Sequence, residues 1–553
     1  MPFIFNDMRK ILSLCLLAML PVVAFPQMKK VAESAGFPET EEGFARILQL
    51  KNGYTMFIVF PFKRGTDDAA IDIKIYDAKH KPKVSKRLTP KYGKLDHNGR
   101  ILAIFETNGD AVLLVQDQEK RTPVLHRLVI DGTKGAFKKQ DVVATIPDIH
   151  LGSAFAVTFG KLPLPGFYVH KDPNSDLYAI ATMNSLEPDR NKRIEMCLYN
   201  GTHEEVSRGF YHSPEDKYKY VEYIDMAIVD QTVNVLGYAY NTRRSGGKEN
   251  IMVLGTLQKG DTSVDVKELD FTHDLELDRG VLSYNPALKK LMMLVYVTKS
   301  GGDNAKGFTR MIYVDPVTKK QLDADDLFPQ EADAKSRELF GRKADYEGRP
   351  VNFSVNPDGS FVVVYEDLGV YIRGGSTYMN SGGQMVSTSS KMNTELQDIA
   401  VSLYDANGKI VKSYFLPKRH FLWSGQPRAF YHAQREGMAA RLFKGDQYKS
   451  FSYINGKDKK FILFNDVEEN TERVQKGKIT AIKGVSDCDA FYYVLEGEDV
   501  LPKRDFVYGD AARRKDHHLG LFAVGDYDRE TNLYVTVKLD PDAKIIKLVW
   551  MEP

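Results

Sequence analysis

Three short segments contain side chains that could bind a metal ion. Residues 172–176, Asp-Pro-Asn-Ser-Asp, have the alternating oxygens of a calcium loop but lack its glycine at the sixth position and its glutamate at the twelfth. The same residue types are common in ordinary turns, and residues 526–530, Asp-Tyr-Asp-Arg-Glu, are similar. His517 and His518 are adjacent, and neighbouring residues of a strand face opposite sides. The sequence therefore predicts turns and a solvated loop at these places, with no metal and no cofactor.

Signatures of well-known catalytic sites are missing from the sequence. It has no Gly-x-Ser-x-Gly nucleophile turn, no His-Glu-x-x-His zinc helix and no phosphate-binding Gly-x-x-x-x-Gly-Lys loop. These absences do not exclude an enzyme, because an active site can be assembled from residues that lie far apart in the sequence. The enzymatic alternative is a glycan hydrolase or lyase that uses a pair of carboxylates.

The strongest candidate for contact with a ligand or partner is a long segment at 368–397. It is rich in glycine and serine, and a connection of this length is usually either functional or disordered. Large side chains interrupt it at Tyr371, Tyr378, Met379 and Met385. Methionine and tyrosine can form an adaptable contact surface, so we take these four residues as the candidate contact residues. Plain flexibility is the competing interpretation.

Two further segments have a functional and an ordinary interpretation. The tyrosine-rich run 211–223 could stack on a sugar or a peptide, or it could be an amphipathic strand with its entry loop. The basic run 243–248, Arg-Arg-Ser-Gly-Gly-Lys, could hold an acidic group. On a nearly neutral chain we expect it to be a solvated hairpin tip.

Strands separated by tight turns must position these residues. Residues 71–76, Ile-Asp-Ile-Lys-Ile-Tyr, alternate apolar and polar as a strand with one wet face should, and a polar turn follows. The same arrangement recurs, with turns that begin at residues 77, 131, 200, 257, 315, 405, 466 and 540. Successive turns are 54 to 90 residues apart. Recurrence at such intervals is typical of radially repeated units.

A continuous apolar strand precedes several of these hairpins. Residues 361–365, Phe-Val-Val-Val-Tyr, follow an Asn-Pro-Asp-Gly-Ser turn at 356–360, and similar arrangements occur at 96–105 and 285–296. An uninterrupted apolar strand is covered on both faces. With one more strand, each unit is the four-stranded blade of a β-propeller.

The turn at 356–360 resembles the Pro-Asp-Gly motif of TolB-like and WD40-like propeller repeats. This resemblance implies a propeller architecture and a binding or scaffolding role, and it carries no catalytic residue. A repeated Trp-Asp signature is excluded, since the chain has only 2 tryptophans.

The predicted fold is all-β, a single propeller of seven or eight four-stranded blades over residues 28–553. Two insertions are expected, at about 323–347, with a helix-compatible stretch from 331 to 340, and at 368–397. Residues 44–50 are expected to complete the final blade and so to remove an exposed sheet edge. Tandem β-sandwich domains are the alternative, although no Pro/Ser-rich linker divides the chain.

The first 27 residues predict export. Arg9 and Lys10 precede an apolar run from Ile11 to Phe25, which is typical of a cleaved signal peptide, and Pro21 interrupts it as a membrane span. We therefore expect a periplasmic or extracellular protein, with no transmembrane span in the mature chain. Beyond this leader the cysteines are Cys197, in an alternating strand, and Cys488, in an Asp-Cys-Asp turn, and we favour two separate buried thiols over one long-range disulfide.

The charge composition narrows the range of possible functions. Lys and Arg number 76 against 74 Asp and Glu, and this near neutrality argues against a nucleic-acid-binding protein. The leading hypothesis is an exported, non-catalytic binding module that presents loops between blades to a protein or glycan partner in the cell envelope. A carboxylate-dependent glycan-active enzyme with its site at the propeller channel is the second hypothesis, and an assembly scaffold is the third.

Overall fold

The computed structural model describes most of the chain from Met28 to Pro553. The described residues leave out 1–27, 62–69, 92–99, 120–121, 148–162, 214–216, 242–249, 270–274, 300–306, 343–344, 374–376, 380–384, 388–390, 423–428, 433–436, 444 and 510–515. The predicted signal peptide and the basic run at 243–248 therefore lie outside the described residues.

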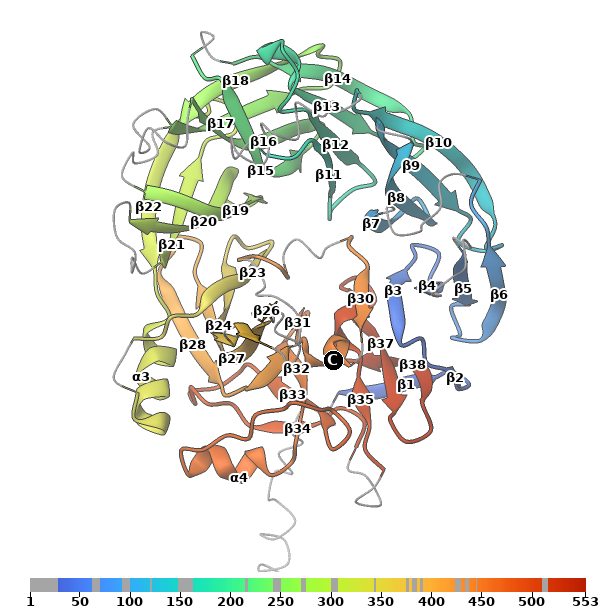
Figure 1. Cartoon of the computed structure of the whole chain (residues 1–553), viewed down its shortest axis with the longest axis vertical. Coiled ribbons are helices and arrows are strands. Elements are labelled where there is room, and N and C mark those ends of the chain that lie inside the picture. Colours follow the sequence, from blue (N-terminus) through green and yellow to red (C-terminus); the bar gives the residue numbers. More distant parts are fainter. Residues whose placement is uncertain are drawn as a thin grey trace, which may run out of the picture.

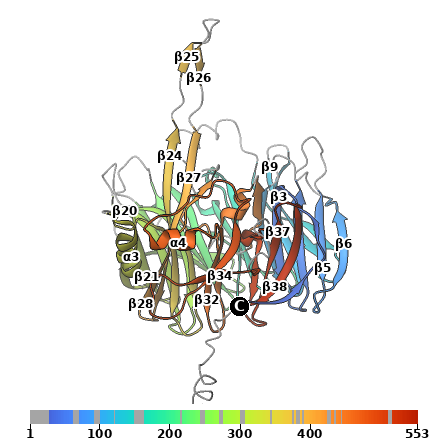
Figure 2. The same ribbon diagram turned by 90° about the horizontal axis from the view of Figure 1, so that it is seen from below.

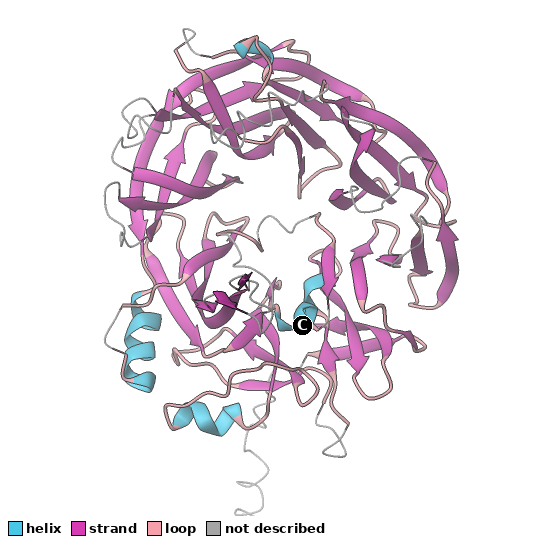
Figure 3. Cartoon of the chain, in the orientation of Figure 1, coloured by secondary structure: helices cyan, strands magenta, loops and turns pink. Residues whose placement is uncertain are grey.

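Eight four-stranded antiparallel blades form a closed ring in the part of the chain that the structure describes, and short extra strands or a parallel contact between two blades enlarge some of the sheets (Figure 1). Strands dominate, and helices are confined to a few short segments (Figure 3). We number the sheets as blades 1 to 8 and give their strands from the centre of the ring outward. The molecule is thus an eight-bladed β-propeller.

Blade 1 contains β3 (Glu42–Gln49), β4 (Thr55–Pro61), β5 (Ile71–Tyr76) and β6 (Pro82–Leu88). Blade 2 contains β7 (Arg100–Thr107), β8 (Asp110–Glu119), β9 (Thr122–Ile130) and β10 (Phe137–Thr145). Blade 3 contains β11 (Gly166–Lys171), β12 (Tyr178–Met183), β13 (Ile194–Tyr199) and β14 (Glu205–Tyr211). Blade 4 contains β15 (Tyr220–Val229), β16 (Thr232–Tyr240), β17 (Asn250–Leu257) and β18 (Ser263–Leu269).

Blade 5 contains β19 (Leu275–Asn285), β20 (Lys290–Lys299), β21 (Gly307–Val314) and β22 (Gln321–Leu327). Blade 6 contains β23 (Arg349–Val355), β24 (Phe361–Arg373), β27 (Lys391–Tyr404) and β28 (Ile410–Leu416). Blade 7 contains β31 (Ser452–Asn455), β32 (Lys460–Asp466), β33 (Asp489–Val494) and β34 (Arg504–Phe506). Blade 8 contains β35 (Leu519–Gly520), β37 (Leu533–Asp540), β38 (Ile545–Glu552) and β1 (Lys29–Glu33).

Shorter elements join these sheets. The strands β2 (Phe37–Pro38), β36 (Asp526–Asp528), β29 (His420–Leu422) and β30 (Ala440–Phe443) pair with β38, β37, β27 and β3 respectively. The helices are η1 (Arg190–Lys192), α3 (Gln330–Phe340), η5 (Asp446–Lys449), α4 (Asn470–Gln475) and η6 (Phe522–Val524). The helix expected at 331–340 is confirmed by α3, which ends at Phe340 and is followed by Gly341 with a positive φ of 61°.

The ring closes through its first described strand. β1 pairs with β38, with Lys29 opposite Glu552, so blade 8 takes its outermost strand from the N-terminal end of the described chain. The expectation that residues 44–50 complete the final blade is wrong, because residues 44–49 belong to β3, which pairs with β4 of blade 1. The closing strand was missed since its sequence, Lys-Lys-Val-Ala-Glu, has no buried apolar face and suits an exposed outer strand.

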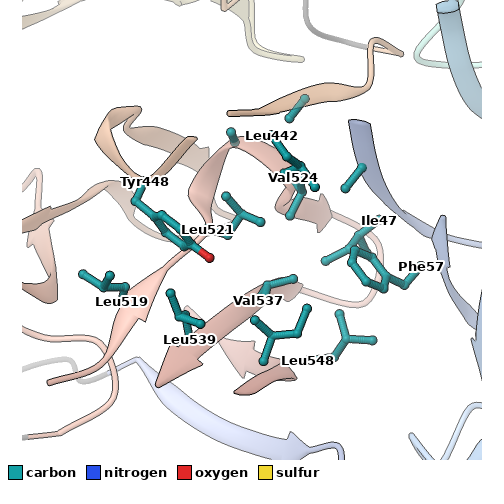
Figure 4. Close-up of a cluster of buried hydrophobic side chains, with 14 of the residues drawn as sticks. Ile47, Phe57, Leu442, Tyr448, Leu519, Leu521, Val524, Val537, Leu539 and Leu548 are labelled. Carbon is teal, nitrogen blue, oxygen red and sulfur yellow. The ribbon is translucent and has the colours of Figure 1, made fainter. Parts of the chain in front are cut away.

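Each contact between neighbouring blades has its own hydrophobic cluster. One cluster joins blades 8 and 1 and includes Ile47, Phe57, Val537 and Leu548 (Figure 4). Seven others follow in order around the ring, from blades 1 and 2 to blades 7 and 8. Both faces of every sheet therefore pack against a neighbouring blade, as the continuous apolar strands predicted. Tandem sandwiches, the alternative, would bury one sheet pair at a time and are excluded.

A carboxylate or amide side chain closes the outer hairpin in five blades. In blade 1, Asp77 Oδ1 accepts hydrogen bonds of 2.9 Å from the backbone N–H groups of Lys79 and Lys81. Equivalent bonds are accepted by Asp131, Asn200, Asp315 and Asp405. These are Asx turns, in which a short polar side chain replaces a backbone partner. These Asx turns explain why polar turns that begin with Asp or Asn recur in the sequence.

Two of the eight predicted turns are not equivalent to the others. The turns at 77, 131, 200, 257, 315 and 405 connect the third and fourth strands of their blades, whereas those at 466 and 540 connect the second and third. Blade 7 contains α4 after β32, and blade 8 receives its fourth strand from β1. The spacing alone could not reveal either change.

Candidate functional site

A two-stranded arm projects from one face of the ring. β24 and β27 pair along their length from Phe361–Tyr404 to Arg373–Lys391, well beyond the end of β23. A small hairpin of β25 (Thr377–Met379) and β26 (Met385–Ser387) continues in the same direction (Figure 2). The segment 368–397, predicted as a loop, is therefore largely a β-ribbon that grows out of blade 6.

The four candidate contact residues all lie on this arm. Tyr371 belongs to β24 and is 46% exposed, while Met379 and Met385 face each other across the tip hairpin and are 67% and 73% exposed. Tyr378 belongs to β25, and its side chain lies outside the described ones. The structure thus brings Met379 and Met385 together and places Tyr371 nearer the ring.

The tip of the arm differs from the rest of the surface in its charge. Residues 374–390 contain no Lys, Arg, Asp or Glu, although 27% of the chain is charged. Two methionines that face each other on an uncharged hairpin form an apolar contact point, since nothing ionic competes with their burial.

One side of the arm carries a polar network around Glu395, whose side chain is 5% exposed. Tyr371 donates a hydrogen bond of 3.2 Å to Glu395, Gln397 donates one of 3.1 Å, and Arg419 contacts both carboxylate oxygens at 3.2 Å. Burial, followed by the Glu395 charge, raises the pKa of Tyr371. Tyr371 also stacks on Phe421 of β29. These contacts fix the lower half of the arm against the segment that follows blade 6.

A β-bulge lies where the arm leaves the ring. Glu366 pairs with Ile399 and Leu368 pairs with Leu396, so that Asp367 faces both Gln397 and Asp398. Bulges redirect side chains and often occur next to functional sites. Here the bulge collects three carboxylates, from Glu366, Asp367 and Asp398, at the base of the arm.

Two cations compensate these carboxylates. Lys418 Nζ lies 2.6 Å from Glu366 Oε1, and Arg342 forms an ion pair with Asp398. Burial lowers the pKa of Lys418, and it raises the pKa of Asp398 to about 6. Burial also raises the pKa of Asp367, whose nearest cation is Arg342 at 3.9 Å. A carboxyl group with a pKa near 6 can hold or release a proton close to neutral pH.

Sequence reasoning did not find this base cluster. Lys418 and Arg342 lie in different connections on either side of the arm, and their approach to Asp398 depends on the bulge. The one local signal was two adjacent acids, Glu366 and Asp367, at the end of an apolar strand. A buried strand that ends in two carboxylates requires partners that sequence alone does not name.

The side chains that could have bound a metal ion form hydrogen bonds and ion pairs with other groups of the protein. Asp172 accepts a hydrogen bond of 3.1 Å from the backbone of Asn174, which makes residues 172–176 the predicted turn. Asp176 pairs with Lys51 at 2.6 Å, and Asp526 accepts a hydrogen bond of 2.8 Å from the backbone of Gln49. His517 Nδ1 lies 2.8 Å from Asp489. Within the described residues, no group of three or more His, Cys, Asp or Glu side chains could hold a metal ion.

The tyrosine-rich run is mostly core. Tyr211, Tyr218 and Tyr223 are buried in the cluster between blades 3 and 4, which favours the amphipathic strand over a stacking site. Cys197 and Cys488 are both free and buried, so the two separate thiols are confirmed.

A cavity of about 710 Å³ lies on the opposite face from the arm. It is lined by residues of the turns in blades 3 and 4: Ser175, Leu177, Asn200, Glu204, Glu205, Val206, Asp230, Gln231 and Lys259. Glu204 and Glu205 are poor candidates for a general acid, because hydrogen bonds from Asn200 and Thr202 lower the pKa of Glu204 and Arg208 pairs with Glu205 at 2.7 Å.

No family model and no curated protein matches the chain. Among solved structures, the Dos1 propeller has 9% identity and a TM-score of 0.41, with 94% of this chain and 95% of that chain covered. The polysaccharide lyase Uly1 has 8% identity and a TM-score of 0.37 over 95% of this chain and 99% of that chain. The WD40 domain of SCAP from fission yeast has 10% identity and a TM-score of 0.33 over 94% of each chain. Scores this low carry no functional conclusion.

Helices that could cross a membrane do not occur in the described part of the chain.

Proposed function

We propose that this protein is an exported binding module that contacts a protein partner through the tip of the β24–β27 arm. The observation that carries the proposal is the exposure of Met379 and Met385, at 67% and 73%, on a hairpin held away from the ring. Tip residues 374–390 are uncharged, so a partner could bury them without removing a charge from water.

The base of the arm supports this role. The ribbon is continuous with blade 6. Ion pairs join Glu395 to Arg419 and Glu366 to Lys418. A rigid pedestal lowers the conformational entropy that is lost when the tip is bound. The arm is therefore better suited to contact than a free loop of the same length would be.

The predicted signal peptide at residues 1–27 supports a periplasmic or extracellular location for this contact. The resemblance of the turn at 356–360 to TolB-like and WD40-like repeats supports the same proposal, since those propellers usually bind or scaffold other proteins. A glycan partner is the alternative at the arm.

Photo-crosslinking tests the proposal directly. A photoreactive amino acid at Met379 or Met385 in cells should give discrete crosslinked bands of higher mass that contain a second polypeptide. The matched control is position 411, where Val411 is 64% exposed on β28 of blade 6, away from the tip. Crosslinks of equal yield at all three positions, or none at the tip, would overturn the proposal, and a product that glycosidases shift would indicate a glycan.

A substitution pair tests the energetic role of the tip. Met379→Ser with Met385→Ser should weaken capture of the crosslinked partner by about tenfold or more, as truncation of exposed apolar anchors does. Val411→Ser is the control, because Val411 is 64% exposed on blade 6 but away from the tip. Thermal unfolding of all variants should be unchanged, since none of these side chains is buried.

A second function, carbohydrate cleavage by paired carboxylates, is favoured by one observation. Asp398, with a pKa raised by burial to about 6, lies in the bulge beside Glu366 and Asp367. If this function is correct, purified protein should release reducing or unsaturated ends from envelope polysaccharides, and Asp398→Asn should abolish the release while leaving far-UV circular dichroism unchanged. Activity that survives in the variant would exclude this cluster as the site.

A further inference from the structure

The outer rim of the ring carries a basic edge on blade 1. Residues 78–88, which include β6, contain five Lys or Arg and no Asp or Glu. Lys83 and Arg87 are 52% and 53% exposed. Their internal partners are Asp77, at 3.7 Å from Lys83, and Asp72, at 2.7 Å from Arg87. Among the described residues, Lys86 contacts the backbone carbonyl of Lys134, at 2.9 Å, and has no ion pair, so the described part of this edge remains positive.

An acidic edge lies on blade 5. β22 contains three acidic residues, Asp323, Asp325 and Asp326, and no Lys or Arg. Asp323 and Asp325 are exposed and have no ion pair among the described side chains, while Asp326 pairs with Arg310 at 2.7 Å. This edge therefore keeps a net negative charge.

The two edges face away from each other. Blades 1 and 5 are four positions apart in a ring of eight, and β6 and β22 lie on opposite sides of it (Figure 1). Each is the outermost strand of its sheet, so its outward edge has no strand partner in the described chain. A single translation can bring β22 of one molecule beside β6 of the next.

The fold already contains one rim contact of this kind. β14 and β18, the outermost strands of blades 3 and 4, pair in parallel, with Phe210 opposite Ser263 and Tyr211 opposite Val264. Outermost strands run in the same direction along the ring axis, because every blade is antiparallel and begins at the centre. Two molecules with parallel axes would therefore place β6 and β22 in parallel as well.

We propose that the chain associates with a second copy of itself through these rims, with the basic β6 edge of one molecule against the acidic β22 edge of the next. Lys83 and Lys86 of one edge then lie close to Asp323 and Asp325 of the other, the two acids of β22 that have no ion pair among the described side chains. Because the edges are on opposite sides of the ring, the contact repeats into an open row. This inference is independent of the arm and goes beyond the proposed partner binding.

Charges on an edge strand also have a simpler role, which is to prevent edge-to-edge pairing. Lysines protect a basic edge against another basic edge, but they attract an acidic one. The overall charge of +2 leaves little repulsion between whole molecules, so the two edges can approach.

Sedimentation velocity tests the association. At about 10 mM salt the wild type should show a weight-average mass that rises with concentration, and at about 1 M salt it should be monomeric, because the screening length falls from about 30 Å to about 3 Å. A protein that stays monomeric at low salt up to about 100 µM would overturn the proposal.

Charge exchange tests the location of the contact. Lys83→Glu with Lys86→Glu leaves β6 with two Glu and one Arg, and Asp323→Lys with Asp325→Lys leaves β22 with two Lys and one Asp, so each double variant reverses the charge of one edge strand. Each double variant alone should associate at least about tenfold more weakly than the wild type, and an equimolar mixture should associate again. No recovery in the mixture would exclude these edges.

The control reverses two other exposed lysines. Lys192→Glu with Lys476→Glu changes the net charge by the same amount at side chains that are 63% and 71% exposed. It should leave the association of the wild type intact. An equal loss in this control would show that only net charge matters and would also overturn the proposal. Circular dichroism identifies any variant that fails to fold, and each pair of substitutions can then be tested as single changes.

Discussion

Lys418 Nζ lies 2.6 Å from Glu366 Oε1, and neither side chain is exposed to solvent. Tyr431 donates a hydrogen bond of 2.7 Å to the other oxygen of the carboxylate, so both oxygens of Glu366 are satisfied. The ion pair connects the strand that forms the arm to the segment that follows blade 6. A buried pair of this kind matters most when one member is removed, because the other is left as an isolated charge.

Removal of the cation should destabilise the protein. We expect Lys418→Met to lower the free energy of unfolding by about 3–5 kcal/mol, since Glu366 would stay buried without its partner. Urea unfolding followed by circular dichroism measures the loss. The double variant Lys418→Met with Glu366→Leu leaves no buried charge and should recover most of it. A single variant as stable as the wild type would show that the charges are not paired as described.

Asp398 should make the stability depend on pH. Burial raises its pKa from 3.8 to about 6, so the native state binds this proton more tightly than the unfolded state does. The contribution of Asp398 to the free energy of unfolding therefore increases as the pH falls from above 6 to about 4. Relative to Asp398→Asn, the wild type should gain up to about 1.4 kcal/mol per pH unit in this window. Urea unfolding at several pH values gives the difference, and a constant difference would contradict the prediction.

Glu33 should stabilise the closure of the ring. Burial acts to raise its pKa, but hydrogen bonds from Lys547 and Lys30 outweigh burial and lower the pKa from 4.5 to about 2. The stabilisation is present above pH 4.5 and is lost as the pH falls through about 2. Glu33→Gln should therefore reduce the melting temperature at neutral pH, by an amount that shrinks at pH 3. The effect should be small, about 1 kcal/mol or less, because water screens a partly exposed pair.

The control for Glu33 is Glu41→Gln. Glu41 pairs with Lys544, and these side chains are 57% and 65% exposed. Its removal should change the melting temperature very little at either pH. If the two variants behave alike, the pairing of β1 with β38 does not depend on Glu33.

The cysteines should be unreactive in the folded protein. Burial raises the pKa of Cys197 to about 12 and that of Cys488 further, so very little thiolate forms at neutral pH. A thiol reagent such as Ellman's reagent should find almost no thiol in the native mature protein and two per chain in urea. Rapid stoichiometric reaction without denaturant, or a shift between reduced and unreduced samples on a gel, would contradict this.

Local features of the chain were predictable wherever neighbours in the sequence determine them. The alternation at 71–76 matches the burial of β5, residues 361–365 are at most 1% exposed, and the outer turn of blade 1 begins at Asp77 as expected. The helix at 331–340 and the two separate thiols follow from the same kind of reasoning. In each case hydrogen bonds and side-chain periodicity act over only a few residues.

Features that join distant segments were not predictable. β1 completes blade 8 across more than 500 residues, and its polar sequence does not identify its partner. The arm was recognised as unusual, but its glycines and serines did not distinguish a ribbon from a loop, because pairing depends on the opposite strand.

Composition and short-range pattern were enough, by themselves, to determine strands, turns and a repeated all-β fold. Tertiary structure decided which strand closes the ring, where the arm stands, and which cations meet Glu366 and Asp398. The physical reason is that burial makes a charge depend on every group packed around it, and those groups come from parts of the chain that only folding brings together.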